Sequence, residues 1–414
     1  MAEQVSSLKT GIKYKDTPIG KIPVDWELVR LGDICSISSG GASNYSKDVN
    51  EKTYPVYGSN GILGSYDEFN FSDGLVIGRV GASGSIHMIS SPVWASDNTL
   101  LLSITDRFAQ KLFIYYYLQK CNLPGLATKT AQPLLTQQIL KSVLIAKPNI
   151  YEQKKIAEIL TTVDEVIEKT DQIIEKTKEV KKGLMQELLT RGIGHKKFKK
   201  TEIGEIPEEW EVKKLVDTAS GEKYSFTGGP FGSDLKQDSF TDYGVRVIQL
   251  QNIGDGDFLD DYKIFTSEEK ADQLKNCNIY PGDIIIAKMA EPVARACIIP
   301  DMDDRYLMAS DGIRLSVDRN KYDTKLILLA INSPYFRKNA EKHGTGTTRL
   351  RIGLTELKNL PIGIPPLEEQ KQIAEILSSA DEGIEKEMNH REQLEALKKG
   401  LMQVLLTGKI RVSV

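Results

Sequence analysis

Two long segments of the chain recur almost unchanged about two hundred residues later. EQKKIAEIL at Glu152–Leu160 returns as EQKQIAEIL at Glu369–Leu377, with eight of nine positions identical. KKGLMQELLT at Lys181–Thr190 returns as KKGLMQVLLT at Lys398–Thr407, with nine of ten identical. The same 217 positions separate both pairs. A repeat of this length predicts that one structural framework is present twice.

A third repeat shows that the material inside the framework has diverged. TPIGKIPVDW at Thr17–Trp26 corresponds to TEIGEIPEEW at Thr201–Trp210, but here the separation is 184 positions. The two separations differ by 33 positions, so the segments between the repeats differ in length. We therefore expect two unlike heads on a common handle.

The handle is predicted to consist of two long helices. Residues 151–190 lie between Pro148 and Gly192 and would form a helix about 60 Å long at 1.5 Å per residue. The second copy follows Pro366 and runs to Gly408. In both, apolar residues recur at steps of three and four, as in a coiled-coil seam. The seam positions are Ile156, Ile159, Val163, Val166, Thr170, Ile173, Thr177, Val180 and Leu184, then Ile373, Ile376, Leu377, Ala380, Ile384, Leu394, Leu397, Leu401 and Leu405.

The heads, residues 22–147 and 206–364, have the pattern of mixed α/β domains with short strands. GLVIGRV at Gly74–Val80 and GDIIIAK at Gly282–Lys288 are β-branched runs, and ASDNTLLLSI at Ala95–Ile104 is echoed by ASDGIRLSVD at Ala309–Asp318. The predicted fold class is thus α+β, with two mixed α/β domains and two long, paired antiparallel helices about a pseudo-twofold axis. Helices are also expected at 111–120 and 324–330.

The predicted segments are a first head at 1–148, a first long helix at 149–192, a second head at 193–365 and a second long helix at 366–414. The arrangement is circular. GIKYKDTPIG at Gly11–Gly20 resembles GHKKFKKTEIG at Gly194–Gly204, which follows the first long helix. Residues 1–20 are therefore expected near 408–414.

Composition limits the function classes. The 414 residues carry a net charge of −3, so a nucleic-acid site must be a local patch. The chain has no apolar run of about 20 residues, no apolar signal segment and no Cys-x-x-Cys pair among its four cysteines. We expect a protein of the prokaryotic cytoplasm.

Motifs for catalysis are missing from the sequence. It contains no Asn/Asp-Pro-Pro-Tyr/Phe motif for amino-methyl transfer and no Walker A motif, and its four histidines lack metal-ligand spacing. A nuclease or methyltransferase in its own right is therefore disfavoured.

The entry to each long helix resembles the specificity subunit of type I restriction-modification systems. The matching residues are Pro148, Ile150, Glu152, Gln153, Ile156 and Ala157 in the first copy, and Pro365, Leu367, Glu369, Gln370, Ile373 and Ala374 in the second. YPVYGSNGILGSYDEF at Tyr54–Phe69 and GPFGSDL at Gly229–Leu235 are similar to target-recognition domains of that family.

This resemblance implies a non-catalytic, sequence-specific DNA-binding subunit. Each head would read one half of a bipartite, asymmetric site in double-stranded DNA, and the helices would set the spacing. Two DNA-adenine methyltransferase subunits would dock on the helices, and restriction and translocase subunits would join that core. S-adenosylmethionine, ATP and Mg would be bound by these partners, with no cofactor or metal in this chain.

Direct base reading requires Arg, Lys, Asn, Gln or a similar donor in the major groove. The predicted DNA-binding residues are Asn60, Arg79, His87 and Lys129 in the first head, and Gln249, Asn252, Lys288, Arg295, Arg349 and Arg351 in the second. Each could instead form a surface ion pair or a phosphate contact. Arg79 and Lys288 follow matching strands.

The near-identity of the repeats beyond the seam predicts partner contacts at Met185, Gln186, Met402 and Gln403. Duplicated surfaces suit two identical partner subunits. The same residues could simply pack the helices together. A coiled-coil scaffold whose heads bind protein or small ligands remains the alternative.

Overall fold

The chain divides into two compact units, each with one head and part of each long helix. Unit 1 comprises Met1–Gln172 with Met388–Val414, and unit 2 comprises Ile173–Glu387. The computed structural model describes residues 12–42, 45–46, 53–81, 83–128, 133–289, 291–346 and 350–413. The division into four segments predicted above stays a prediction, because these units group residues by contact and cut both long helices.

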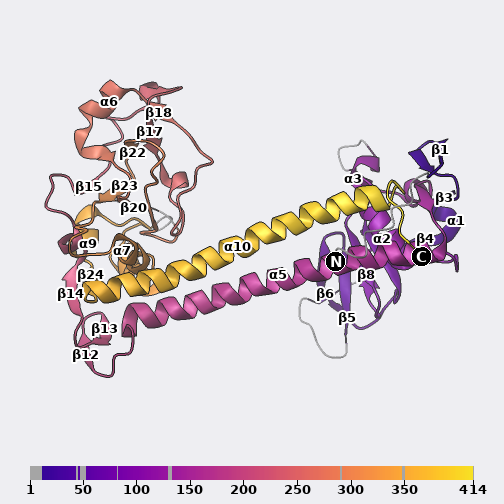
Figure 1. Cartoon of the computed structure of the whole chain (residues 1–414), viewed down its shortest axis with the longest axis horizontal. Helices are drawn as coiled ribbons and strands as arrows, with labels where there is room; N and C mark the ends of the chain where they lie inside the picture. The colour runs from indigo at the N-terminus through magenta and orange to yellow at the C-terminus, as the bar shows by residue number, and fades with distance from the viewer. Residues whose placement is uncertain are drawn as a thin grey trace. The chain divides into compact units, whose positions relative to one another are not determined.

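The two long helices begin and end where proline and glycine predicted. Helix α5 spans Ile150–Arg191 and helix α10 spans Leu367–Leu405 (Figure 1). Asn149 caps α5, because its Oδ1 accepts hydrogen bonds from the backbone N–H groups of Tyr151 and Glu152 at 3.1 and 3.0 Å.

Within unit 1 the helices pair antiparallel. Asp164 of α5 forms an ion pair with Lys398 of α10 at 2.6 Å, and Asp171 pairs with Arg391 at 2.5 Å. From the first pair to the second, the residue number rises by seven on α5 and falls by seven on α10, so the two helices run in opposite directions.

Unit 2 repeats this pairing with the other copies of the same residues. Lys181 of α5 forms an ion pair with Asp381 of α10. Lys181 and Asp381 are the repeat equivalents of Lys398 and Asp164, each 217 positions away. Seven residues further along α5, Leu188 packs in one apolar cluster with Ala374, seven residues back along α10.

Only five of the eighteen predicted seam positions are buried, and five are exposed. On α5, Ile156 and Thr170 are buried, whereas Ile173 and Val180 are 48% and 59% exposed. The following residue is buried instead at two positions, Leu160 after Ile159 and Ile174 after Ile173. On helix α10 the predicted positions Ile373, Leu377 and Leu405 are buried, whereas Ile376 and Leu397 are exposed. The seam register predicted at Ile173 was wrong by one residue.

The first head contains two main sheets and short flanking pairs. A four-stranded sheet has the order β4-β10-β7-β8, a three-stranded sheet has the order β6-β5-β9, and β1-β2 and β3-β11 form separate pairs. The strands are β1 Tyr14–Thr17, β2 Gly20–Pro23, β3 Glu27–Arg30, β4 Cys35–Ser39, β5 Tyr54–Gly58, β6 Gly61–Tyr66, β7 Gly74–Gly78, β8 Ile86–Ile89, β9 Trp94–Ala95, β10 Thr99–Ile104 and β11 Leu144–Lys147.

The second head repeats the four-stranded sheet and enlarges the other. Its sheets have the orders β15-β23-β20-β21 and β16-β18-β17-β22-β19, with β12-β13 and β14-β24 as separate pairs. The strands are β12 Phe198–Thr201, β13 Gly204–Pro207, β14 Glu211–Lys214, β15 Phe226–Gly228, β16 Phe240–Thr241, β17 Val245–Ile248, β18 Phe265–Thr266, β19 Asn278–Ile279, β20 Ile284–Ala287, β21 Ala296–Ile298, β22 Tyr306–Met308, β23 Gly312–Leu315 and β24 Pro361–Ile364.

Short helices cover the sheets. The predicted helices at 111–120 and 324–330 correspond to α2 Lys111–Lys120 and α7 Thr324–Ile331. The others are α1 Leu31–Ile34, α3 Leu123–Leu126, α4 Gln137–Lys141, α6 Glu268–Gln273, α8 Pro334–Lys342 and α9 Leu354–Asn359, with 3-10 turns η2 Leu215–Thr218, η3 Gln237–Ser239, η4 Leu250–Asn252 and η5 Lys275–Cys277. No helix in the described ranges is long and apolar enough to cross a membrane.

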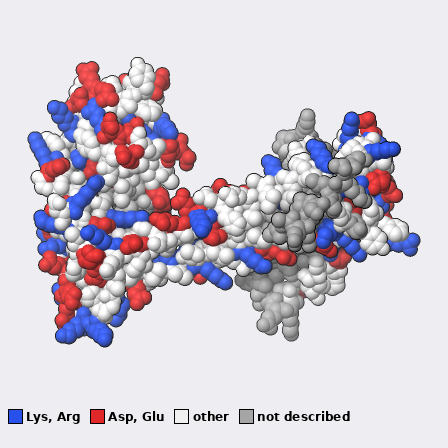
Figure 2. All heavy atoms as spheres, viewed as in Figure 1, with Lys and Arg blue, Asp and Glu red and all other residues white. Residues whose placement is uncertain are grey.

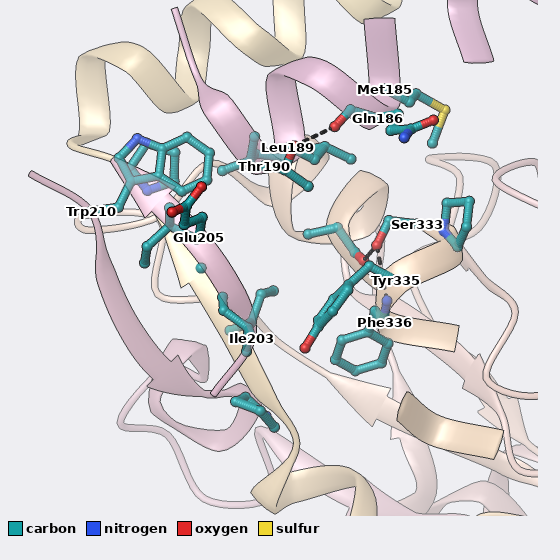
Figure 3. A pocket seen from close by; sticks show the side chains of 18 of the residues that line it. Met185, Gln186, Leu189, Thr190, Ile203, Glu205, Trp210, Ser333, Tyr335 and Phe336 are labelled. Atoms are coloured by element: carbon teal, nitrogen blue, oxygen red, sulfur yellow. Dashed lines mark hydrogen bonds between the residues drawn. The ribbon is translucent and has the colours of Figure 1, made fainter. Parts of the chain in front are cut away.

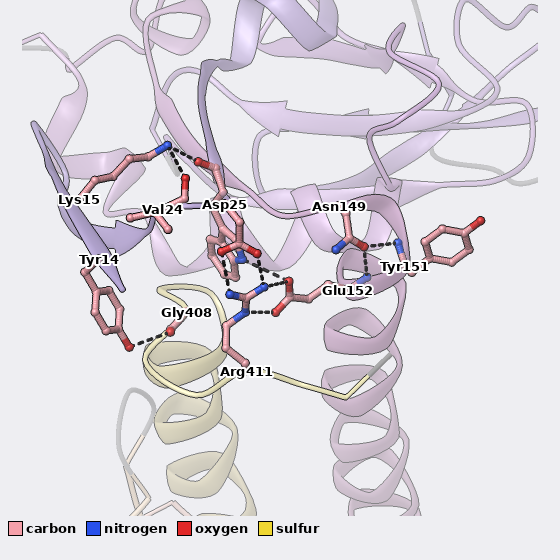
Figure 4. A network of polar contacts seen from close by, with 10 residues as sticks. Tyr14, Lys15, Val24, Asp25, Asn149, Tyr151, Glu152, Gly408 and Arg411 are labelled. Carbon is pink, nitrogen blue, oxygen red and sulfur yellow. Dashed lines mark hydrogen bonds and ion pairs between the residues drawn. The ribbon is translucent and has the colours of Figure 1, made fainter. Parts of the chain in front are cut away.

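A glutamate at the start of each long helix, buried in unit 1 and partly buried in unit 2, fastens the handle to a head. In unit 1, Glu152 accepts a hydrogen bond from the indole N–H of Trp26 at 3.2 Å and binds the guanidinium of Arg411, which also pairs with Asp25 (Figure 4). Tyr14 adds a hydrogen bond from its hydroxyl to the carbonyl of Gly408 at 3.2 Å. The two ends of the chain therefore meet, as the circular arrangement predicted.

Unit 2 contains the equivalent clamp with a histidine in place of the arginine. Glu369 accepts a hydrogen bond from the indole N–H of Trp210 at 3.1 Å and from the backbone N–H of Ile193 at 2.9 Å. His195 takes the place of Arg411, and its Nε2 lies 2.9 and 3.0 Å from the two carboxylate oxygens.

The glutamine that follows each glutamate joins the helix to the head by backbone contacts. Gln153 accepts from the N–H of Gln110 at 2.8 Å and donates to the carbonyls of Phe108 and Pro148. Gln370 accepts from the N–H of Asp323 at 2.9 Å and donates to the carbonyl of Pro365 at 2.8 Å. Gln110 and Asp323 are the N-caps of α2 and α7, so each glutamine binds an equivalent helix start.

Removing one glutamate should destabilise its own unit. We expect Glu369→Ala to lower the free energy of unfolding of unit 2 by about 2–4 kcal/mol, because Trp210, His195 and Ile193 lose a buried acceptor. Urea denaturation measures the change. Glu375→Ala on the exposed side of α10 is the control, and a loss no greater than that of the control would contradict the clamp.

Candidate nucleic-acid interface

The two heads place a cation at the same point of the same sheet. Arg79 directly follows β7 and Lys288 directly follows β20. The backbone N–H of Arg79 donates to the carbonyl of Asn98 at 3.0 Å, and that of Lys288 donates to the carbonyl of Asp311 at 2.8 Å. A later segment of the chain pairs with the backbone of each cation: the N–H of Leu135 donates to the carbonyl of Arg79, and that of Ile352 donates to the carbonyl of Lys288, both at 2.9 Å. We call these places the first and second corner. The first corner contains residues 39–41, 79, 98 and 135–137. The second corner contains residues 228–231, 288, 310–311 and 351–352.

A glycine lets two chain segments approach closely in each corner. A Cβ on Gly40 would lie 2.1 Å from the carbonyl oxygen of Ser96, and one on Gly229 would lie 1.9 Å from that of Ala309. Real Cβ atoms do not approach oxygen this closely, so neither position accepts a larger residue without a backbone shift. Both glycines also donate to the partner segment, at the carbonyls of Thr99 and Gly312.

The first corner combines a guanidinium with two polar side chains. Nη1 of Arg79 lies 3.4 Å from the hydroxyl of Ser39, and the amide of Gln137 contacts that hydroxyl at 2.9 Å. The buried Nε of Arg79 has no hydrogen-bond partner among the described residues. Arg79 therefore keeps donors for a ligand, and a guanidinium is suited to bidentate contact with guanine.

The second corner combines two cations with an acid. Nζ of Lys288 donates to the carbonyl of Ser310 at 3.0 Å, and Arg351 forms an ion pair with Asp311 at 3.1 Å while its side chain stays 53% exposed. Burial lowers the pKa of Lys288, and nearby Arg351 lowers it further. An approaching anion would oppose both effects, since an opposite charge favours the charged form of the ammonium group.

Other predicted residues of the first head lie in the neighbouring hairpin and strand. Asn60 is exposed in the turn between β5 and β6. His87 lies in β8 against the ring of Tyr57, with 5.5 Å between the ring centroids, and its buried Nε2 has no partner in the described part of the chain. Lys129 and Arg349 lie outside the described residues, so their predictions have no structural account.

Three predicted residues of the second head surround the 3-10 turn η4 and not the second corner. Asn252 is fully buried, accepts from the N–H of Gln249 at 3.0 Å and donates to the carbonyls of Leu259 and Tyr262. Arg295 donates to the carbonyl of Leu250 at 2.9 Å. These contacts shape a loop, and Asn252 has no amide group left to reach a base. The predictions for Gln249 and Arg295 stay predictions.

Sequence reasoning missed Ser39, Gln137 and Phe231 as corner residues. The only local sequence feature that marks the corners is a Gly-Gly pair in each head. The pair at 40–41 directly follows β4, and the pair at 228–229 begins with the last residue of β15. The pairing of distant segments that brings Gln137 to Ser39 is not visible in the sequence.

The charge distribution agrees with local cationic sites. Over the described part of the visible face of each unit, Lys and Arg are interspersed with Asp and Glu (Figure 2). Binding of an anionic polymer must therefore depend on a few placed cations and not on a broad positive surface. Within the described ranges, no group of three His, Cys, Asp or Glu side chains could hold a metal ion.

The predicted partner residues line one groove in each unit. In unit 2, Met185 and the exposed Gln186 border an apolar groove of about 350 Å³ between α5, β13 and α8, with Tyr335 and Phe336 on its other side (Figure 3). In unit 1, Met402 and Gln403 border a more polar groove of about 730 Å³ beside α2 and α3. Met402 itself is buried, so its side chain packs within unit 1 and is not a freely exposed partner contact.

The whole chain is similar to known proteins. A family model described as the type I restriction modification DNA specificity domain matches residues 23–179 and 207–396. The type I restriction enzyme MjaVIII specificity subunit of Methanocaldococcus jannaschii is 31% identical, with 95% of this chain and 94% of the relative covered. The putative MjaX specificity subunit from the same organism is 30% identical, with 96% of this chain and 97% of the relative covered.

Two solved structures share the fold. The S subunit of a type I restriction-modification system from M. genitalium aligns with a TM-score of 0.58 and 15% identity, over 96% of this chain and 97% of the other. A chain from a structural study of complex assembly and conformational transition in a type I system aligns with a TM-score of 0.60 and 16% identity, over 94% and 99%. These likenesses confirm the predicted α+β fold.

The chain belongs to the family of type I restriction modification DNA specificity domains and contains the domain twice. It is a DNA-recognition subunit that assembles with other subunits, and it is not the catalytic component. The family predicted from the repeated helix motif is thereby confirmed, and the scaffold alternative loses its support.

The close approach at the second corner can be tested with a pair of glycines. We expect Gly229→Ala to lower the free energy of unfolding of unit 2 by about 1–3 kcal/mol, because its methyl group must displace the carbonyl of Ala309. Gly232→Ala, three residues later in open space, is the matched control. Equal stability of the two variants in urea denaturation would show that the corner tolerates movement.

Proposed function

We propose that each head reads one half of a bipartite, asymmetric sequence in double-stranded DNA through its corner. The observation that carries this proposal is the repetition of one backbone frame with different side chains. Arg79, Ser39 and Gln137 occupy the first corner, whereas Lys288, Asp311 and Arg351 occupy the second. Equal frames give both heads the same approach to a groove, and unequal donors and acceptors select different bases.

The proposal assigns the base contacts to a small set of side chains. Arg79 presents a planar fork of donors, and Lys288 and Arg351 present donors beside an acceptor, Asp311, which can accept from the amino group of cytosine. Asn60 and His87 lie on the adjoining hairpin and strand and are proposed to extend the first contact. Lys129 and Arg349 remain proposed from the sequence alone.

The long helices are proposed to set the spacing of the half-sites and to dock two copies of a methyltransferase subunit. Five exposed positions of the predicted seam support docking. Val166, Ile173 and Val180 on α5 are 36%, 48% and 59% exposed at seven-residue steps, and we call them, with Ile376 and Leu397 on α10, the outer stripe. Val180 and Leu397 are repeat equivalents. This equivalent pair fits two identical partners, whose helices would cover it.

The remaining parts of the complex are proposed from the family resemblance. Restriction and translocase subunits would join the core, and S-adenosylmethionine, ATP and Mg would be held by the partner subunits. The free cysteines Cys35, Cys121, Cys277 and Cys297 are not assigned a role in this scheme.

The reading proposal predicts separate effects of the two corner cations. We expect Arg79→Gln to relax or weaken recognition of one half of the methylated sequence about tenfold, and Lys288→Gln to do so for the other half, because each bidentate or paired contact discriminates by ~1–3 kcal/mol. Methylome sequencing of cells that express the chain with its methyltransferase subunit identifies the halves, and equilibrium binding to single-base variants measures the loss.

Lys263→Gln is the control for loss of a cation in the same head, since Lys263 is half exposed and pairs with Asp260 away from the corner. Uniform weakening of all DNA sequences by both corner variants would indicate phosphate contacts and contradict base reading.

The docking proposal predicts that the outer stripe binds the methyltransferase. We expect Val180→Arg with Leu397→Arg to reduce its co-purification at least about tenfold, because two charges would enter an apolar interface without partners. Both side chains are exposed, so the fold should tolerate the change better than Met402→Arg in the buried position. Glu168→Arg with Glu385→Arg introduces the same residues at equivalent exposed sites on another face. Unchanged co-purification of the stripe variant would contradict docking there.

A further inference from the structure

An aromatic side chain stands in solvent at the edge of the second corner. Phe231 is 83% exposed, the highest value among the large apolar residues of the described ranges together with Tyr243. A phenylalanine ring gains about 1.5–3 kcal/mol when it is buried, so a free surface position forgoes that stabilisation. A single exposed apolar residue is ordinary, and the surroundings of Phe231 must decide whether it has a role.

The loop that carries Phe231 is fixed at both ends. Gly229 donates to the carbonyl of Gly312 at 2.9 Å and lies against Ala309, and the next residue, Pro230, is buried. After the ring, the N–H of Asp234 donates to the carbonyl of Phe231 at 2.8 Å, and Leu235 packs against an apolar cluster. The backbone therefore holds the ring outward, which lowers the conformational entropy that binding would cost.

The loop that carries Phe231 begins next to the cations of the corner. A Cβ on Gly228 would lie 2.9 Å from the Nζ of Lys288, and Phe231 follows three residues later, within at most about 11 Å of backbone. Arg351 is also exposed in this corner and contacts Asp311. An exposed apolar ring on a loop that begins at these cations matches a ligand with flat apolar faces and an anionic backbone, and DNA has both.

We propose that Phe231 is a wedge that inserts between two adjacent base pairs of the half-site read by the second head. This inference rests on the proposed DNA-reading function and extends it to one base step. Apolar side chains such as Phe partly unstack a step and kink the duplex, and stacking on the ring offsets part of the loss. Pyrimidine–purine steps unstack most easily, so the wedge favours such a step without contacting a base edge.

At the position that corresponds to Phe231, the first head has Ala42 and no aromatic ring. Gly40 and Gly229 make the same close contact, and the residues that follow are Gly41 and Ala42 in the first head but Pro230 and Phe231 in the second. The wedge is therefore specific to one half-site, and the other half-site is an internal control.

The test uses the complex of the full chain with its methyltransferase subunits and duplexes of the methylated sequence. 2-Aminopurine, whose fluorescence rises when it is unstacked, replaces one base at a time in each half, away from the methylated adenines. We expect a several-fold rise at one step of one half only. Phe231→Ala should abolish it and weaken binding about tenfold, and Phe231→Trp should retain it. Tyr243→Ala, an equally exposed aromatic on the β16–β17 turn, should change neither.

The outcomes separate the wedge from the reading function. Sequence-specific binding without a rise in either half, or with a rise that Phe231→Ala leaves intact, overturns the wedge alone. Weaker binding by Phe231→Ala without any rise in the unchanged complex shows surface contact and also overturns it. Absence of sequence-specific binding by the unchanged complex overturns the proposed function and the wedge with it.

Discussion

The structure depends on a carboxylate at the start of each long helix, buried in unit 1 and partly buried in unit 2. Glu152 binds a tryptophan indole and Arg411, Glu369 binds a tryptophan indole and His195, and the glutamine that follows fixes the start of a head helix. A buried carboxylate is stable only when its hydrogen bonds are satisfied, so the clamp requires the head, the helix start and the segment after the opposite helix together. The repeated Glu-Gln pair at the start of each long helix thus joins head to handle and is not free for partners.

The two clamps differ in the side chain that faces the carboxylate and in the further contacts around it. Arg411 binds Glu152 in unit 1, and its guanidinium also holds the pKa of Asp25 below its usual value. His195 occupies the corresponding place beside Glu369 in unit 2, where the backbone N–H of Ile193 also donates to the carboxylate. One repeated geometry is thus maintained by an arginine in one unit and by a histidine in the other. The repeated backbone structure accommodates this exchange of side chains, as it accommodates different side chains in the two corners. The equivalent backbone contacts around the exchanged side chains are kept.

Much of the architecture could be predicted from the sequence, because it follows from repetition, proline and glycine. The bounds of α5, the helices at 111–120 and 324–331 and the meeting of the chain ends were accessible in this way. The seam register was not, because Ile173 and Ile174 are both apolar and only tertiary packing selects Ile174. Asn252 shows the same limit at the site, since its side-chain chemistry suited a base but its burial commits it to a loop. Gln137 and Phe231 are brought to the corners only by the pairing of strands that lie far apart in the sequence.

The central claim is that one repeated handle carries two independent readers. Exchange of residues 206–364 for the matching segment of a family relative, followed by methylome sequencing in cells that contain the methyltransferase subunit, tests it most directly. The account predicts that one half of the methylated sequence changes to that of the donor while the other half is retained. An unchanged sequence, or a change in both halves, would contradict it.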